Sequence, residues 1–192
     1  MVGSIHCPGG KCDDFAVSFY QQLRLLTAAG NAREAEEILK KCLDCLSRYF
    51  ESTAGSACTL YLYFGRNSGL SFYLGSEAFC NPLCWRGGRL AEALRAPAEQ
   101  LTKNAQVARY YYCSDLSAND GISASCIIAS IRPVVANLDR WRENSGFLVL
   151  LSEPGRLDER MARELVMFAY ELFEAMSLQR ASDGCQGETR GW

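Results

Sequence analysis

The region over 126–178 constrains the fold most, because two apolar strands and an amphipathic helix follow one another there with little sequence between them. The expected strands are 126–131 and 146–151, separated by a polar loop. A short turn then leads into a helix that we expect over 157–178. Two strands and a closing helix in this order predict part of an α/β sandwich, in which the helix covers one face of a sheet. The other face of that sheet is then available for function.

The composition indicates one globular domain. The chain has 192 residues, 48% of them hydrophobic, and a chain of this length most often folds as a single unit with a sizeable core. We expect that domain over 13–180, with a flexible leader over 1–12 and a flexible tail over 181–192, both rich in small and polar residues.

The charge and hydropathy argue against two classes of partner. The formal net charge is −2, so the chain lacks the basic footprint that nucleic-acid-binding proteins usually carry. No window approaches the roughly 18 uninterrupted apolar residues of a membrane span, and the N-terminus does not have the layout of a secretory signal. We therefore expect a cytoplasmic protein that binds neither nucleic acid nor membrane.

Two helices are expected near the N-terminus. Apolar spacing predicts the first over 14–29, ending at Gly30, which is a favourable C-cap. Asn31, with Glu34 three residues later, has the pattern of a capping box and begins a second helix. That helix is expected to end near Phe50.

The middle of the chain predicts further strands. Residues 57–64 and 70–74 are rich in strand formers and flank a turn sequence, which predicts a β-hairpin. We expect a short helix over 90–94 that stops near Pro97, and then a strand over 106–113 followed by an acidic loop. Because strands adjacent in sequence pair as hairpins, an antiparallel sheet is favoured over a parallel one.

Three parts of the chain share the apolar and small-residue pattern of a known family. They are a helix with the strand after it, the central strand pair and the closing helix, over 36–62, 125–150 and 157–172. These segments resemble the GAF family of sensory domains. The resemblance implies an α/β (α+β) fold with a central antiparallel sheet of about five or six strands. It implies N- and C-terminal helices on one face, which often form a dimer bundle, and a pocket made by loops and a short helix on the other.

The chain departs from GAF members whose ligands are characteristic. It does not contain the Asn-Lys-x-Asx-Phe signature of cyclic-nucleotide-binding members. Phytochrome-type members place a histidine directly after the chromophore-linking cysteine, whereas His6 precedes Cys7 here. The members that reduce free methionine sulfoxide use cysteines whose layout does not match Cys80, Cys84 or Cys113. Cyclic nucleotides and bilins are therefore unsupported, and the reductase reading stays open without an indication for it.

The sequence contains no recognisable catalytic constellation. His6 is the only histidine, and a hydrolase triad needs a base, usually histidine, beside its nucleophile. The run Gly9-Gly10-Lys11 lacks the spacing of a phosphate-binding loop. We expect a non-catalytic domain without a cofactor.

Ten cysteines raise the alternatives of metal binding and redox chemistry. Cys42 and Cys45 have zinc-ligand spacing, but they fall on the apolar face of an expected helix, where cysteine usually acts as a small hydrophobe. Cys80 and Cys84 lie in an irregular segment before Arg86, and a nearby cation favours a reactive thiolate. We therefore predict no metal site and name Cys80 and Cys84 as the redox candidates.

Aromatic and small residues on the expected strands supply the candidate ligand site, because pockets are mostly apolar with a few polar groups. Successive strand residues point to opposite faces, so Tyr110 and Tyr111 cannot both face one pocket. The predicted ligand-binding residues are Phe72, Trp85, Tyr111, Cys113, Ile127 and Ala129.

Three functional hypotheses remain. The first is a regulatory domain that binds a small molecule or a protein partner and signals through dimerisation or partner contact, as a homodimer through its terminal helices. The second is a protein-interaction adaptor whose pocket is filled by its own side chains. The third is a cysteine-based redox or zinc sensor. A longin or roadblock fold is a less suitable alternative, because two consecutive helices come first in this chain.

Overall fold

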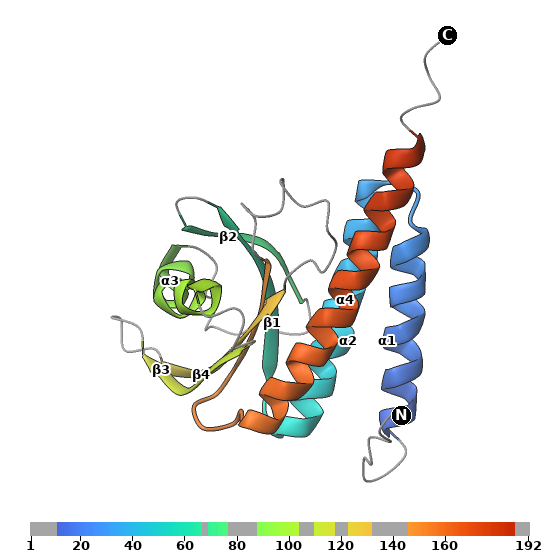
Figure 1. The fold of residues 1–192 in the computed structure, drawn as a ribbon. Helices are drawn as coiled ribbons and strands as arrows, with labels where there is room; N and C mark the ends of the chain where they lie inside the picture. The colour runs from blue at the N-terminus through green and yellow to red at the C-terminus, as the bar shows by residue number, and fades with distance from the viewer. Residues whose placement is uncertain are drawn as a thin grey trace.

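The computed structural model describes residues 11–66, 69–76, 88–103, 110–117, 123–131 and 146–186. Within these ranges the chain forms a mixed α/β fold, with one sheet between a group of three helices and a single helix (Figure 1). The helices are α1 (Lys11–Ala28), α2 (Ala32–Ala54), α3 (Gly88–Lys103) and α4 (Glu159–Gln186). The strands are β1 (Cys58–Arg66), β2 (Gly69–Gly75), β3 (Tyr110–Ser117), β4 (Ser123–Ile131) and β5 (Gly146–Ser152).

The strands pair in the order β2-β1-β5-β4-β3. Every pairing is antiparallel, which confirms the predicted sheet type. β5 lies at the centre, and all of its residues are buried, because its uninterrupted apolar run is covered on both faces. Leu150 of β5 pairs with Leu60 of β1 on one side and with Ile127 of β4 on the other. The two strands expected over 126–131 and 146–151 are therefore neighbours in the sheet.

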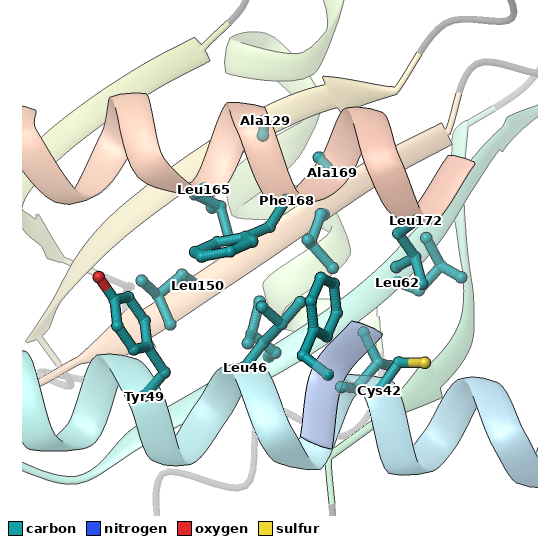
Figure 2. Packing of buried hydrophobic residues seen from close by; sticks show 14 of the residues in the cluster. Cys42, Leu46, Tyr49, Leu62, Ala129, Leu150, Leu165, Phe168, Ala169 and Leu172 are labelled. Atoms are coloured by element: carbon teal, nitrogen blue, oxygen red, sulfur yellow. The ribbon is translucent and has the colours of Figure 1, made fainter. Parts of the chain in front are cut away.

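Helices α2 and α4 cover one face of the sheet, which we call the bundle face, and α1 packs on the outer side of these two helices (Figure 1). Figure 2 shows Leu46, Phe168 and Leu172 of these helices meeting Leu62 and Leu150 of the sheet. Phe168 lies among aromatic rings, with centroid separations of 5.4 to 6.2 Å to four neighbours: Phe15, Phe19, Tyr49 and Phe50. The predicted packing of the terminal helices on one face is confirmed.

The ends of α2 follow local chemistry. The Asn31 side chain accepts a hydrogen bond from the Glu34 backbone N–H at 2.9 Å, and the Glu34 carboxylate accepts one from the Gly30 N–H at 3.0 Å. This reciprocal cap confirms the predicted start of the helix. The helix continues past Phe50 to Ala54, because Gly55 is the residue that adopts the left-handed conformation of a C-cap, with φ of 62°.

Helix α3 covers the opposite face, and it corrects the prediction of a short helix that stops near Pro97. Pro97 lies inside a helix of 16 residues. A proline there removes one backbone hydrogen bond and costs about 3 kcal/mol. Leu94, Ala98 and Leu101 are each at most 3% exposed on either side of it, and burying them against the sheet offsets that cost at roughly 25 cal/mol per Å².

Two other boundaries differ from the predictions. β3, described over Tyr110–Ser117, continues past the predicted end at 113, because an irregularity between Cys113 and Leu116 lets its pairing with β4 continue. The predicted start over 106–109 lies outside the described residues. The carbonyl of Ser114 in this irregular part accepts hydrogen bonds from the Ser125 hydroxyl at 2.8 Å and from the Gly155 N–H at 3.0 Å. α4 continues to Gln186, past the expected end at 178, since no proline interrupts it. In the described part of the chain, no helix has both the length and the apolar content to span a membrane.

Candidate functional site

The face of the sheet under α3 carries a second, smaller core, which we call the α3-side cluster. Its residues alternate along each strand with those of the bundle face, as the period of a strand requires. Tyr111 and Leu116 of β3 are partly buried against this cluster. Its buried members are Tyr61, Tyr63, Leu94, Ala98, Leu101, Ala124, Cys126, Ile128, Phe147, Val149 and Leu151.

Polar side chains gather within this apolar layer. Cys113 and Cys126 are direct partners across the β3–β4 ladder, so their side chains share a face. Tyr111 and Cys113 are two residues apart on β3, so their side chains lie on the same face of the strand and interact there. Tyr63 is 2% exposed, and its ring lies 6.3 Å from that of Tyr61, edge to face. Phenols and thiols from three strands therefore meet on one face of the sheet.

Cys126, Tyr63 and Tyr111 stay uncharged at neutral pH. Burial, followed by the neighbouring Cys113, raises the pKa of the Cys126 thiol well above its ordinary range. Burial also raises the pKa of Tyr63, with smaller contributions from Tyr61 and Cys126. The pKa of Tyr111 is raised by burial first and by Cys113 second. Since the thiolate is the nucleophilic form of cysteine, this environment disfavours thiol catalysis at Cys126 and favours neutral hydrogen bonding.

Access to these groups is greatest at β3, the strand at one edge of the sheet. Tyr111, Cys113 and Leu116 are partly exposed, whereas Cys126 and Ile128 on the neighbouring strand are at most 1% exposed. We call Tyr111, Cys113 and Cys126 the β3-edge site. It offers a phenol and a thiol that are partly exposed, beside the buried Cys126 thiol and an apolar wall, without a charged group among its members.

The structure brings together some of the predicted ligand-binding residues and separates others. Tyr111 and Cys113 share the β3-edge site, and their binding role stays a prediction. Phe72 pairs with Tyr63 in the β2–β1 ladder, so it lies at the other edge of the sheet from β3. Trp85 and the redox candidates Cys80 and Cys84 lie outside the described residues.

Ile127 and Ala129 require a correction. Both are 0% exposed and belong to the core under α1, α2 and α4, so they cannot line the same site as Tyr111. They alternate along β4 with Cys126 and Ile128, which face α3. The predicted site therefore combined residues from opposite faces of the sheet. The register that pairs Cys113 with Cys126 identifies the row of β4 that shares a face with Tyr111.

Cys42 and Cys45, the pair with zinc-ligand spacing, both lie on α2. Cys42 is 0% exposed in the core, and burial raises its thiol pKa from 9.0 to about 12. Cys45 is one turn away and lies 3.5 Å from the Ser18 hydroxyl oxygen. In the ranges that the structure describes, histidine, cysteine and acidic side chains do not form any group of three or more that could hold a metal ion. Cys42 is thus a core residue.

Several solved structures share this architecture at low sequence identity. The GAF domain of a phosphoenolpyruvate-protein phosphotransferase from Coxiella burnetii aligns with a TM-score of 0.54 and 12% identity, over 91% of this chain and 99% of that one. A bacteriophytochrome from R. palustris aligns with a TM-score of 0.58 and 10% identity, over 95% of this chain and 41% of that one. The free methionine-R-sulfoxide reductase from Neisseria meningitidis aligns with a TM-score of 0.50 and 15% identity, over 95% of this chain and 99% of that one.

The comparisons settle the fold. No protein-family model matches the chain, and no curated protein sequence matches it. The structural likeness nevertheless covers 91% to 95% of this chain in these three alignments. The GAF-like fold expected from the sequence is confirmed.

Proposed function

We propose that this protein is a non-catalytic regulatory domain that binds an uncharged small molecule at the β3-edge site. It signals by changing its contacts with a second copy of itself or with a protein partner. The GAF-like fold supports a sensory role, since GAF domains are sensory modules. A neighbour with this fold was determined in complex with its substrate, which is a precedent for small-molecule binding within the architecture.

The observation that carries this proposal is the group of neutral polar side chains in an apolar layer. A buried phenol or thiol without a hydrogen-bond partner is costly, so such groups are usually paired. At the β3-edge site the side chains of Tyr111 and Cys113 interact on one face of the strand and are partly exposed. A ligand that supplies a hydrogen-bond donor or acceptor and an apolar body can bind both groups without burying a charge. An ionised ligand would meet no compensating charge among these three residues.

A second candidate is a protein-interaction adaptor whose pocket is closed by its own side chains. The packing under α3 favours it, because Ile128, Phe147 and Val149 are at most 1% exposed there. In this case the α3-side cluster is simply a second core, and the surface of the protein carries the function.

Thermal stability in the presence of metabolites separates the two candidates. A compound at 100 times its dissociation constant adds about 2.7 kcal/mol to the free energy of unfolding. We expect uncharged aromatic or heterocyclic compounds to raise the melting temperature of the wild-type protein. Tyr111→Phe should weaken this effect. Tyr110→Phe is the matched control, because Tyr110 is the preceding strand residue and packs on the bundle face.

The alternative outcomes are informative. Stabilisation by charged compounds alone would contradict the proposed ligand class. No stabilisation by any compound in a broad metabolite set would favour the closed adaptor. Consumption of free methionine sulfoxide by the purified protein with a thiol reductant would contradict the non-catalytic assignment.

A further inference from the structure

The outer surface of α4 carries an apolar stripe that the fold does not bury. Met167 and Tyr170 are each 49% exposed, and residues three apart on a helix share a face. The opposite side of α4 is core: Figure 2 shows Leu165, Phe168 and Leu172 directed toward the sheet and α2. Exposed apolar side chains are common when they are single, but neighbouring ones on a helix indicate an interaction surface.

The stripe continues onto α1. The Tyr20 hydroxyl donates to the Glu171 carboxylate at 3.1 Å, so Tyr20 lies directly beside α4. Tyr20 is 45% exposed and Val17, one turn earlier, is 68% exposed. Phe19 on the inner side of α1 contacts Phe168, with ring centroids 5.4 Å apart. These contacts place the exposed part of α1 level with Met167 and Tyr170, which widens the apolar surface.

Charges of opposite sign flank the stripe symmetrically. Arg163 precedes Met167 by four residues and Glu174 follows Tyr170 by four residues, and both charged residues are exposed. All four positions lie on one face of the helix by their spacing. A two-fold axis through the midpoint of Met167 and Tyr170 would place Met167 opposite Tyr170 and Arg163 opposite Glu174. The surface is therefore complementary to its own antiparallel copy.

We propose that a second copy of this chain docks on this stripe, with the two α4 helices antiparallel and the Arg163 of each copy opposite the Glu174 of the other. The inference rests on the proposed function only for its claim that signalling uses a homodimer. A parallel arrangement would place Arg163 against Arg163 and Glu174 against Glu174, and like charges across an interface are unfavourable. The self-complementary patch is what a closed two-fold dimer requires.

Charge reversal tests the arrangement, with dimer dissociation measured by sedimentation equilibrium. Arg163→Glu and Glu174→Arg should each raise the dissociation constant about tenfold, since two ion pairs become two repulsions. The double variant should restore the wild-type value, because the pairs re-form with reversed sign. Met167→Glu should raise the constant by about a hundredfold, because it brings a charge into the apolar centre.

Arg95→Glu on α3 is the matched control. Arg95 pairs with Glu99 at 3.3 Å on an exposed helix surface, much as Arg163 pairs with Glu159 at 3.5 Å. This variant makes the same charge change and loses the same kind of intrahelical pair, and it should leave dimerisation unchanged. Circular dichroism and thermal melting of every variant would show that the fold is retained.

Each contrary outcome overturns a defined part of the inference. A wild-type protein that stays monomeric at about 100 µM overturns the homodimer, whereas the β3-edge site is tested separately by the effect of Tyr111→Phe on ligand stabilisation. Single reversals that weaken the dimer without restoration in the double variant overturn the antiparallel register. A dimer that tolerates Met167→Glu overturns the α4 surface as its interface.

Discussion

The two faces of the sheet use polar groups differently. On the bundle face, polar side chains make fixed contacts with groups from other elements: the Tyr49 hydroxyl donates to Glu164 at 3.1 Å and the Tyr112 hydroxyl donates to the Leu157 carbonyl at 2.8 Å. On the α3 side, the side chains of Tyr111 and Cys113 interact within one strand and stay partly exposed. A contact between elements holds the fold together, whereas a contact within one strand can be exchanged for a ligand. The first face is therefore structural, and we propose that the second is the one that binds a ligand.

The largest expected effect is on the bundle face. Phe168→Ala removes a ring that is 6% exposed and contacts four other aromatic rings. The free energy of unfolding should fall by about 3–5 kcal/mol, because the loss of buried surface is joined by the cost of a cavity. Chemical denaturation measures this change. A loss below about 1 kcal/mol would show that the aromatic cluster is not the structural centre of the protein.

Alkaline pH should destabilise the protein, and the buried thiols of the bundle core contribute part of this loss. Burial raises the pKa of Cys42 from 9.0 to about 12 and that of Cys58 from 9.0 to about 11. The folded state then holds these protons more tightly than the unfolded state. The stabilisation is complete below pH 9 and is lost as the pH rises toward 11 and 12, at up to about 1.4 kcal/mol per pH unit for each thiol.

Denaturation curves from pH 7 to pH 11 would measure this loss, and Cys42→Ala serves as the comparison. Without the buried thiol the decline above pH 9 should be shallower than in the wild-type protein. Equal slopes in the two proteins would contradict the assignment of Cys42 as a protonated core residue.

A smaller effect distinguishes neighbouring tyrosines on β3. Tyr112→Phe removes the hydrogen bond to the Leu157 carbonyl, which ties the edge strand to the start of α4, and should cost about 0.5–1.5 kcal/mol. Tyr110→Phe removes a hydroxyl from a partly buried ring on the same face and should cost less than about 0.5 kcal/mol. Equal losses would show that the link between β3 and α4 contributes no net stability.

Much of the fold could be predicted because local signals agree with it. The Asn31 and Glu34 cap, the central apolar strands and the closing helix each form from residues close in sequence. The predictions were wrong where distant contacts decide the outcome. α3 passes through Pro97 because burial of Leu94 and Leu101 against the sheet offsets the lost hydrogen bond, and this burial is invisible to local propensity.

The site was harder to predict for a related reason. Alternation along β4 places Ile127 and Cys126 on opposite faces of the sheet, but it does not say which of the two residues faces α3. That choice depends on the register with β3, where Cys126 pairs with Cys113, and on the packing of α3. Tyr63 joins the cluster from β1, two strands away from β4, so its place there follows from strand order and not from its sequence neighbours.

The alkylation rate of Cys113, compared with that of Cys45, tests the difference between the two faces most directly. Both cysteines are partly exposed, Cys113 at the β3-edge site and Cys45 against the bundle core. Peptide mapping after timed alkylation, with and without a compound that raises the melting temperature, gives both rates in one sample. We expect the compound to slow the labelling of Cys113 and to leave that of Cys45 unchanged. Protection of Cys45 alone, or of both to the same degree, would contradict binding on the α3 side of the sheet.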